Sequence, residues 1–227
     1  EDGSRGVMVE INSETDFVAK NDEFVEFASQ VATTVLANNP ADVAALNETN
    51  LEGGSTTVEG RRQELIAKLG ENMAVRRFSV VDSEGGVIGF YSHGGRIGVM
   101  TALQGGDAVL AKDVSMHVAA SKPVALGEED IPAEVLEKEK EIFVAQAQES
   151  GKPAEIIEKM IVGRMKKFVN EITLLGQPFV KDPDVTVAKL MDNNSAKIVQ
   201  FARLEVGEGI EKKEENFADE VMAQVKG

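Results

Sequence analysis

A strand-and-helix pattern occurs twice in this 227-residue chain and limits how the chain can fold. The segment Gly98–Gln104 resembles Gly6–Asn12, 92 residues earlier, which has the apolar, β-branched character of a strand. The segment Asp113–Ala120 resembles Glu26–Thr33, 87 residues earlier, which lies in a stretch with helical spacing. The first copy therefore carries five more residues between its strand and its helix. The repeat predicts an α+β protein with two related subdomains, each a small antiparallel sheet packed with helices.

The extra residues of the first copy lie around Thr15-Asp16-Phe17-Val18, in a polar connection that follows the first strand. A Phe in such a connection has no evident core to join. One explanation is a hydrophobic staple, in which a residue before a helix packs back onto that helix, with Asp16 as a local turn residue. The other explanation is contact with a second protein. Spacing alone leaves both explanations open.

Charge and composition narrow the classes of function. The net charge of −15 disfavours direct nucleic-acid binding, which requires a basic surface. The nearest basic candidate, residues 164–167, is better explained as the solvated end of a helix. No run reaches the roughly 18 apolar residues of a membrane span. The chain contains no Cys, which excludes disulfides and thiolate chemistry and fits a reducing compartment. We therefore expect a cytoplasmic protein without a membrane partner.

Apolar runs and turn residues predict the remaining elements of the core. The expected strands are, in order, Gly6–Asn12, Met73–Val81, Gly86–Tyr91, Gly98–Gln104 and Lys197–Val206. The second and third of these are expected to pair through the turn at 82–85, and the last to join the second sheet. Asn21 or Asp22 is a suitable N-cap for the first long helix, and Gly70 is expected to end a helix near 59–69.

A helical hairpin interrupts the second copy. Ile131-Pro132-Ala133 opens one helix, and Ser150-Gly151-Lys152-Pro153 separates it from a second helix of similar length. Apolar residues follow one side of each helix and charges the other, which predicts an antiparallel coiled coil that projects from the core. Residues 216–226 predict a short C-terminal helix. The expected parts are a core N-subdomain at 1–92, a core C-subdomain at 93–129 and 170–210, the hairpin at 130–169, and a C-terminal helical module at 211–227.

Recognisable catalytic motifs are missing from the sequence. It has no phosphate-binding loop of the Walker type, no nucleophile elbow and no His-Glu-x-x-His metal motif. His93 precedes two glycines that could cradle an anion, but a hairpin turn entering a strand explains residues 93–98 better. His117 lies on an otherwise apolar helix, where a hydrogen-bonded, half-buried His is the default interpretation. We predict no catalytic residue, no metal site and no cofactor.

Motifs spread along the chain resemble those of the elongation factor Ts family, the exchange factors of elongation factor Tu. The first is Val9–Asp22, with Thr15-Asp16-Phe17-Val18 at its centre. The others are Lys68–Asn72, Tyr91–Val99, Met116–Pro123, Ser150–Pro153, Gly163–Phe168 and Val206–Glu211. The resemblance covers essentially the whole chain, and the hairpin and C-terminal helix suggest the longer bacterial form. Family members usually begin with a small ubiquitin-associated-like helical domain, which nothing before Gly6 could encode.

The resemblance implies a guanine nucleotide exchange factor rather than an enzyme. The family's Asp-Phe pair, matched here by Asp16 and Phe17, enters the GTPase domain of elongation factor Tu beside its magnesium and nucleotide site, where the aromatic wedges between helices. The implied partner-binding residues are Thr15, Asp16, Phe17, Val18, Leu69, Gly70 and His93. The second subdomain is expected to bind another domain of the GTPase, and the C-terminal helix to add a contact. The hairpin is the element linked to self-association, so a homodimer is one expectation.

Two other classes of function stay open at this point. A noncatalytic scaffold or chaperone-like protein could use the helical hairpin as its working surface. An enzyme could use Asp16 and His93 as acid and base, but the sequence offers them neither a supporting partner nor a substrate pocket.

Overall fold

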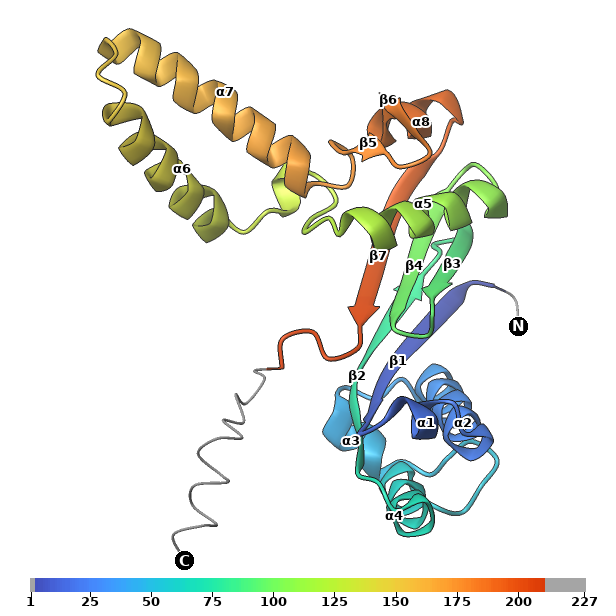
Figure 1. Ribbon diagram of the computed structural model, residues 1–227. Helices are drawn as coiled ribbons and strands as arrows, with labels where there is room; N and C mark the ends of the chain where they lie inside the picture. Colours follow the sequence, from blue (N-terminus) through green and yellow to red (C-terminus); the bar gives the residue numbers. More distant parts are fainter. Residues whose placement is uncertain (1–2, 211–227) are drawn as a thin grey trace, which may run out of the picture.

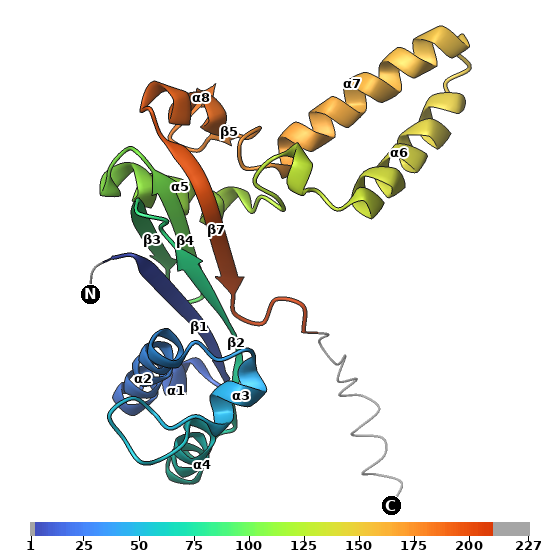
Figure 2. The ribbon, with the colours of Figure 1, turned by 180° about the vertical axis from the view of Figure 1, so that it is seen from behind.

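The computed structural model describes residues 3–210, which form three parts along the molecule (Figure 1). The first four helices gather at one end, long strands cross the middle, and a helical hairpin extends from the other end, as the view from behind also shows (Figure 2). The predicted α+β class and the projecting hairpin are confirmed. The predicted C-terminal helix and the module at 211–227 lie outside the described residues.

The predicted strands and long helices occur in the expected order, together with short helices and strands that were not predicted. The strands are β1 (Arg5–Ser13), β2 (Met73–Asp82), β3 (Val87–His93), β4 (Ile97–Gln104), β5 (Pro178–Phe179), β6 (Asp182–Thr186) and β7 (Lys197–Glu205). The helices are α1 (Asp16–Ala19), α2 (Asp22–Asn38), α3 (Val43–Glu48), α4 (Val58–Leu69), α5 (Ala108–Ser121), α6 (Ala133–Gln148), α7 (Ala154–Ile172) and α8 (Val187–Asn193), with a 3-10 turn at Glu128–Asp130. Asn21 caps α2 by accepting the N–H of Glu23, and Gly70 ends α4 with a φ of 75°, both as expected.

One predicted strand pair is wrong. β2 does not pair with β3: it runs antiparallel to β1, from Asp82 opposite Arg5 to Met73 opposite Ser13. β3 instead pairs with β4, and β7 lies on the other side of β4, as expected for the late strand. At the end of β2 the N–H of Ser83 still bonds to the carbonyl of Ser4, which continues the β1–β2 ladder. Glu84 and Gly85 then adopt positive φ and turn the chain into the second sheet.

The two copies of the repeat pack against each other through matched residues. A Cβ on Gly98 would lie 2.9 Å from the sulfur of Met8, and a Cβ on Gly6 would lie 2.8 Å from the sulfur of Met100. Gly6 and Met8 occupy the same repeat positions as Gly98 and Met100, so each copy's methionine fills the space left by the other copy's glycine. Both methionines are buried in one apolar cluster. This reciprocal contact gives the crossing of β1 and β4 an approximate local twofold relation.

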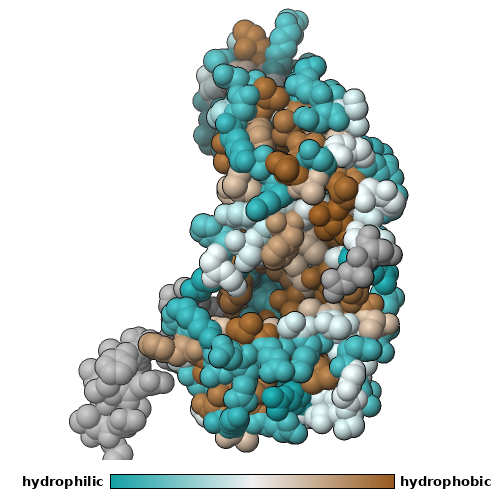
Figure 3. Space-filling view, turned by 90° about the vertical axis from the view of Figure 1, so that its right-hand side faces the viewer, coloured by the Kyte–Doolittle hydropathy of each residue, from teal (hydrophilic) through white to brown (hydrophobic). Residues whose placement is uncertain are grey.

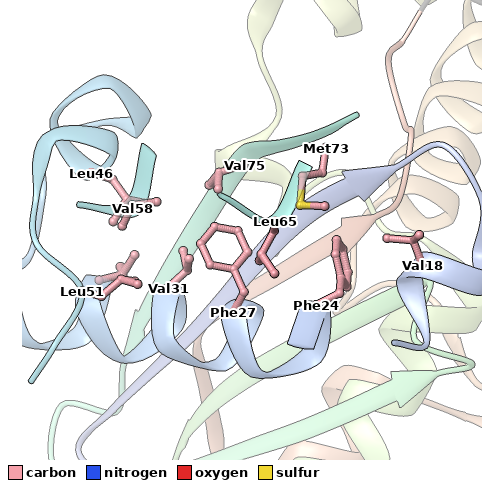
Figure 4. Packing of buried hydrophobic residues seen from close by; sticks show 11 residues of the cluster. Val18, Phe24, Phe27, Val31, Leu46, Leu51, Val58, Leu65, Met73 and Val75 are labelled. Atoms are coloured by element: carbon pink, nitrogen blue, oxygen red, sulfur yellow. The ribbon is translucent and has the colours of Figure 1, made fainter. Parts of the chain in front are cut away.

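Each copy also has its own core. In the first, helices α2, α3 and α4 cover β1 and β2, with Phe27 of α2 completely buried at the centre of the cluster in Figure 4. In the second, α5 packs on β3 and β4 and α8 on β7, and Val114 of α5 is completely buried. The helical period of apolar residues is therefore a sound guide to both buried faces.

A buried carboxylate joins the two sheets. The side chain of Glu10 on β1 is 1% exposed and accepts hydrogen bonds from Arg76, Arg77 and the N–H of Gly207. A β-bulge leaves Arg76 as an extra residue in β2, so two consecutive arginines reach the same carboxylate. Burial raises the pKa of Glu10, but the hydrogen bonds from Gly207, Arg76 and Arg77 outweigh it and hold the pKa below its ordinary value.

The hairpin has a much thinner core. The rings of Phe143 and Phe168 meet edge to face, with centroids 6.4 Å apart, and the Arg164 guanidinium lies 5.6 Å from the centroid of Phe143. Ile156, one of the residues on the apolar side predicted for the second helix, is nevertheless 46% exposed, and Val162 is 69% exposed. Helices α6 and α7 pack mainly on each other and leave these apolar side chains in solvent.

Candidate functional site

The connection between strand and helix differs between the two copies as the repeat predicts. Eight residues (14–21) separate β1 from α2, whereas three residues (105–107) separate β4 from α5. The difference of five residues is therefore confirmed. In the first copy the added length forms the four-residue helix α1.

Thr15 is the N-cap of α1 and connects this helix to the segment that follows α4. Its hydroxyl oxygen accepts the N–H of Val18 at 3.4 Å, which is the usual bond of a helix N-cap. The same hydroxyl donates to one carboxylate oxygen of Glu71 at 2.7 Å, and the Thr15 N–H donates to the other at 3.0 Å. The position of α1 is thus set by a residue far away in the sequence.

Phe17 and Val18 take opposite environments. Phe17 is 84% exposed, whereas Val18 is 8% exposed and packs in the first core near Phe24 (Figure 4). Neighbouring helical residues point about 100° apart, so a single turn lying on a surface can bury one of them and not the other. The staple explanation for Phe17 is therefore wrong, because Val18 supplies the apolar anchor.

Asp16 stands beside Phe17 on the same exposed turn. Its carboxylate lies 3.4 Å from the Lys20 ammonium, and both side chains are more than three-quarters exposed. An ion pair as exposed as this one contributes little to stability. Both groups can therefore turn to other charges at small cost.

The Leu69-Gly70 segment lies next to this turn. Leu69 is half-buried against the first core, and Gly70 is exposed with no atom within 4 Å of an added Cβ. Glu71 follows directly, so its carboxylate connects this segment to Thr15. The sequence prediction missed Glu71, although it belongs to the Lys68–Asn72 motif.

His93 ends β3 at a tight turn. Its Nδ1 lies 3.2 Å from the Tyr91 hydroxyl, and the N–H of Arg96 bonds to the His93 carbonyl, which closes the turn and confirms the hairpin interpretation. A groove of about 760 Å³ separates this turn from α1; it is lined by Thr15, Asp16 and Phe17 on one side and Gly94, Gly95 and Arg96 on the other. On the side of the molecule shown in Figure 3, apolar residues gather where the strands meet the end of the molecule that holds α1 to α4.

His117 has no part in this site. It is completely buried, more than expected, with Nε2 3.0 Å from the Gln177 side-chain oxygen and Nδ1 accepting the N–H of Val180. Burial lowers the pKa of His117, and the hydrogen bond to Gln177 opposes this only in part. The neutral ring therefore serves as a hydrogen-bonded core residue.

Residues 3–210 lack two further features. Within that range no group of three or more His, Cys, Asp or Glu side chains could hold a metal ion. In the same range, every helix is too short or too polar to span a membrane.

Comparison with known proteins decides the family. The family model described as Elongation factor TS matches residues 14–208. The chain belongs to the elongation factor Ts family. It is 61% identical to Elongation factor Ts of Thioalkalivibrio sulfidiphilus and 60% identical to that of Alkalilimnicola ehrlichii. A third relative, Elongation factor Ts of Methylococcus capsulatus, is 58% identical. Each alignment covers all of this chain and 77% of the relative. Membership of the elongation factor Ts family places the chain in translation elongation.

Proposed function

We propose that this chain is a guanine nucleotide exchange factor that binds elongation factor Tu in its GDP form and promotes the release of GDP, so that GTP can replace it. The observation that carries the proposal is Phe17, an aromatic side chain that is 84% exposed on a turn tied to the fold on both sides. Aromatic residues that insert into a pocket of a partner supply much of the affinity of protein interfaces.

The turn is ordered before any partner arrives, which supports a role in binding. Val18 anchors it from below, and Thr15 holds it through Glu71. A preorganised contact loses less conformational entropy on binding than a mobile one. Phe17 then acts as the wedge and Asp16 lies beside it, toward the magnesium and phosphate site that the family's Asp-Phe pair approaches.

Such a mechanism needs no covalent chemistry. GDP is released when the factor stabilises a conformation of the GTPase in which the magnesium and phosphate contacts are poor. The coupling is reciprocal, so GDP weakens binding of the factor as much as the factor weakens binding of GDP. Each ~1.4 kcal/mol of coupling changes affinity tenfold. Leu69, Gly70 and His93 are proposed to supply further contacts to the same domain.

The test is stopped-flow release of a fluorescent GDP analogue from elongation factor Tu. Phe17→Ala is expected to lower the stimulated release rate at saturating factor at least tenfold, while the thermal unfolding midpoint stays the same. Val162→Ala on α7 is the matched control, since it also removes an exposed apolar side chain. The wedge role is refuted if Phe17→Ala releases GDP at the rate of the unaltered chain.

A second candidate function rests on exposed apolar side chains of the hairpin, where Ile142 is 40% exposed, Ile156 46% and Val162 69%. These side chains suit a scaffold or chaperone-like protein that binds its partner through α6 and α7, or self-association into a homodimer. Deleting residues 134–168 separates the two functions. An exchange factor retains most of its stimulated GDP release, whereas a hairpin scaffold loses its partner.

A further inference from the structure

We infer that Glu71 is a positioning residue that locks the Thr15–Val18 turn to the Leu69-Gly70 segment, so that both meet the partner as one rigid surface. The inference rests on the proposed exchange function and assigns a role to a residue whose carboxylate bonds to Thr15. It follows from three features of the Glu71 carboxylate.

The first feature is the geometry of the contact. The two oxygens of Glu71 accept the two donors of a single residue, the N–H of Thr15 at 3.0 Å and its hydroxyl at 2.7 Å. Two bonds to one residue define its orientation as well as its place. Hydrogen bonds to a charged acceptor are also stronger than those between neutral groups.

The second feature is the continuation of the bond into α1. Because the Thr15 hydroxyl gives its proton to Glu71, its free lone pair faces the N–H of Val18 and caps the helix. A helix of four residues is not stable in isolation. The order of α1, and with it the direction of Phe17, therefore depends on contacts from outside the helix.

The third feature is the place of Glu71 at the end of a sheet. The β1–β2 ladder ends with Ser13 opposite Met73, so Thr15 and Glu71 would be the next bonded pair two residues further on. The two strands separate beyond this pair, and the Glu71 side chain accepts the Thr15 N–H in place of a main-chain carbonyl. The ladder is thus extended by a side chain at the end of the sheet from which both proposed partner-binding segments emerge.

These features predict a particular kinetic signature. Without Glu71 the turn samples other conformations, and only the ordered fraction can bind, so the apparent affinity falls by that fraction. Once the complex has formed, Phe17 occupies the same place as before. Glu71→Ala is therefore expected to raise the factor concentration needed for half-maximal GDP release about tenfold and to leave the rate at saturation unchanged. Phe17→Ala should lower the rate at saturation instead.

Four further variants complete the experiment, which uses the full chain and elongation factor Tu loaded with a fluorescent GDP analogue. Glu71→Gln keeps one acceptor oxygen and should recover part of the affinity. Thr15→Val is measured alone and combined with Glu71→Ala, and the loss in the double variant should be smaller than the sum of the two single losses, because both substitutions remove the bond between the hydroxyl and the carboxylate. Glu14→Ala removes one negative charge from the same connection and controls for long-range electrostatics. Additive losses, or an unchanged half-saturating concentration in Glu71→Ala, would overturn the inference.

Amide hydrogen exchange of the isolated chain separates this inference from the proposed function. In Glu71→Ala the N–H groups of Val18 and Ala19, which bond to Thr15, should exchange faster, while those of β2 stay protected. Unchanged exchange at Val18 and Ala19 would show that Glu71 does not order the turn. If the unaltered chain fails to release GDP from elongation factor Tu, the exchange function is refuted and the role toward the partner falls with it, whatever the hydrogen exchange shows.

Discussion

The two connections between strand and helix solve the same geometric problem in different ways. In the second copy, Gly105 and Gly106 both adopt positive φ, and Asp107 caps α5 by accepting the N–H of Leu110. A Cβ on Gly105 would lie 2.4 Å from the carbonyl of Ser195, so this connection is pressed against the fold. Three residues are enough to join the strand to the helix there.

The first copy uses eight residues for the same step and has no glycine among them. Its connection carries a helical turn, a buried Val18 and a Phe17 that is 84% exposed. The second copy shows that a strand and a helix can be joined without the added residues. What they add is an aromatic side chain in solvent with a firm base beneath it, which is the arrangement expected of a contact surface.

The largest expected effect tests whether the two copies are equivalent away from their connections. Phe27 and Val114 occupy matched repeat positions and are both completely buried. Phe27→Ala should lower the free energy of unfolding by about 3–5 kcal/mol, and Val114→Ala by about 2 kcal/mol. Urea unfolding followed by circular dichroism measures both. A change below about 1 kcal/mol in either variant would mean that one copy's core is loose.

The second prediction concerns the tightness of the short connection. Gly105→Ala combines a positive φ with a contact to the Ser195 carbonyl, so it should cost about 2–4 kcal/mol. Gly70→Ala has a similar φ but open space around it and should cost only about 1 kcal/mol. Differential scanning calorimetry of both variants gives the comparison. Equal losses would show that crowding does not distinguish the short connection.

The third prediction stays within the long connection. Val18→Ala should cost about 1–2 kcal/mol because it removes two buried methyl groups. Phe17→Ala should change the free energy of unfolding by less than about 0.5 kcal/mol, since the ring is already in water. Equilibrium unfolding in urea separates the two. A large loss of stability in Phe17→Ala would give the ring a structural role and weaken the contrast between the connections.

The smallest expected effect is a pH dependence carried by one copy only. His117 stands where the first copy has Gln30, and burial holds its pKa below the unfolded value. The folded chain therefore binds fewer protons than the unfolded chain. The contribution of His117 to the free energy of unfolding is fully present above about pH 6.5. It falls as the pH drops toward the folded pKa, by at most about 1.4 kcal/mol per pH unit.

His117→Gln, which gives the second copy the first copy's residue, should remove this slope between about pH 7 and pH 5. Unfolding midpoints in urea at several pH values measure it. Glu10 has a lowered pKa, so its contribution is lost only in the more acidic range, below its unfolded value of 4.5. A slope that persists in His117→Gln would assign the pH dependence to other groups.

Much of this architecture could be predicted from residues close together in the sequence. The caps at Asn21 and Gly70, the hairpin turn after His93 and the apolar faces of α2 and α5 were all predicted correctly, because each depends on a few neighbouring residues. The five-residue difference between the copies also followed from spacing alone.

The errors concern choices between distant partners. The strand at 73–81 was expected to pair with its neighbour, yet it pairs with β1, since the alternation of a strand shows which face is apolar and not which strand lies beside it. Phe17 and Val18 were indistinguishable as apolar residues in a polar connection. Only the orientation of α1 on the first core decides which of them is buried.

By itself, the sequence determined the long helices, the caps at Asn21 and Gly70, the repeat and the family, because helix periods, caps and motifs are short-range patterns. The tertiary structure decided the pairing of β1 with β2, the packing of Met8 and Met100 against the glycine of the other copy, and the bond from Thr15 to Glu71 across 56 residues. Each of these contacts joins two segments that are remote in the sequence, and it forms only where the fold brings them close together. That proximity is set by packing of the whole chain, and no local pattern contains it.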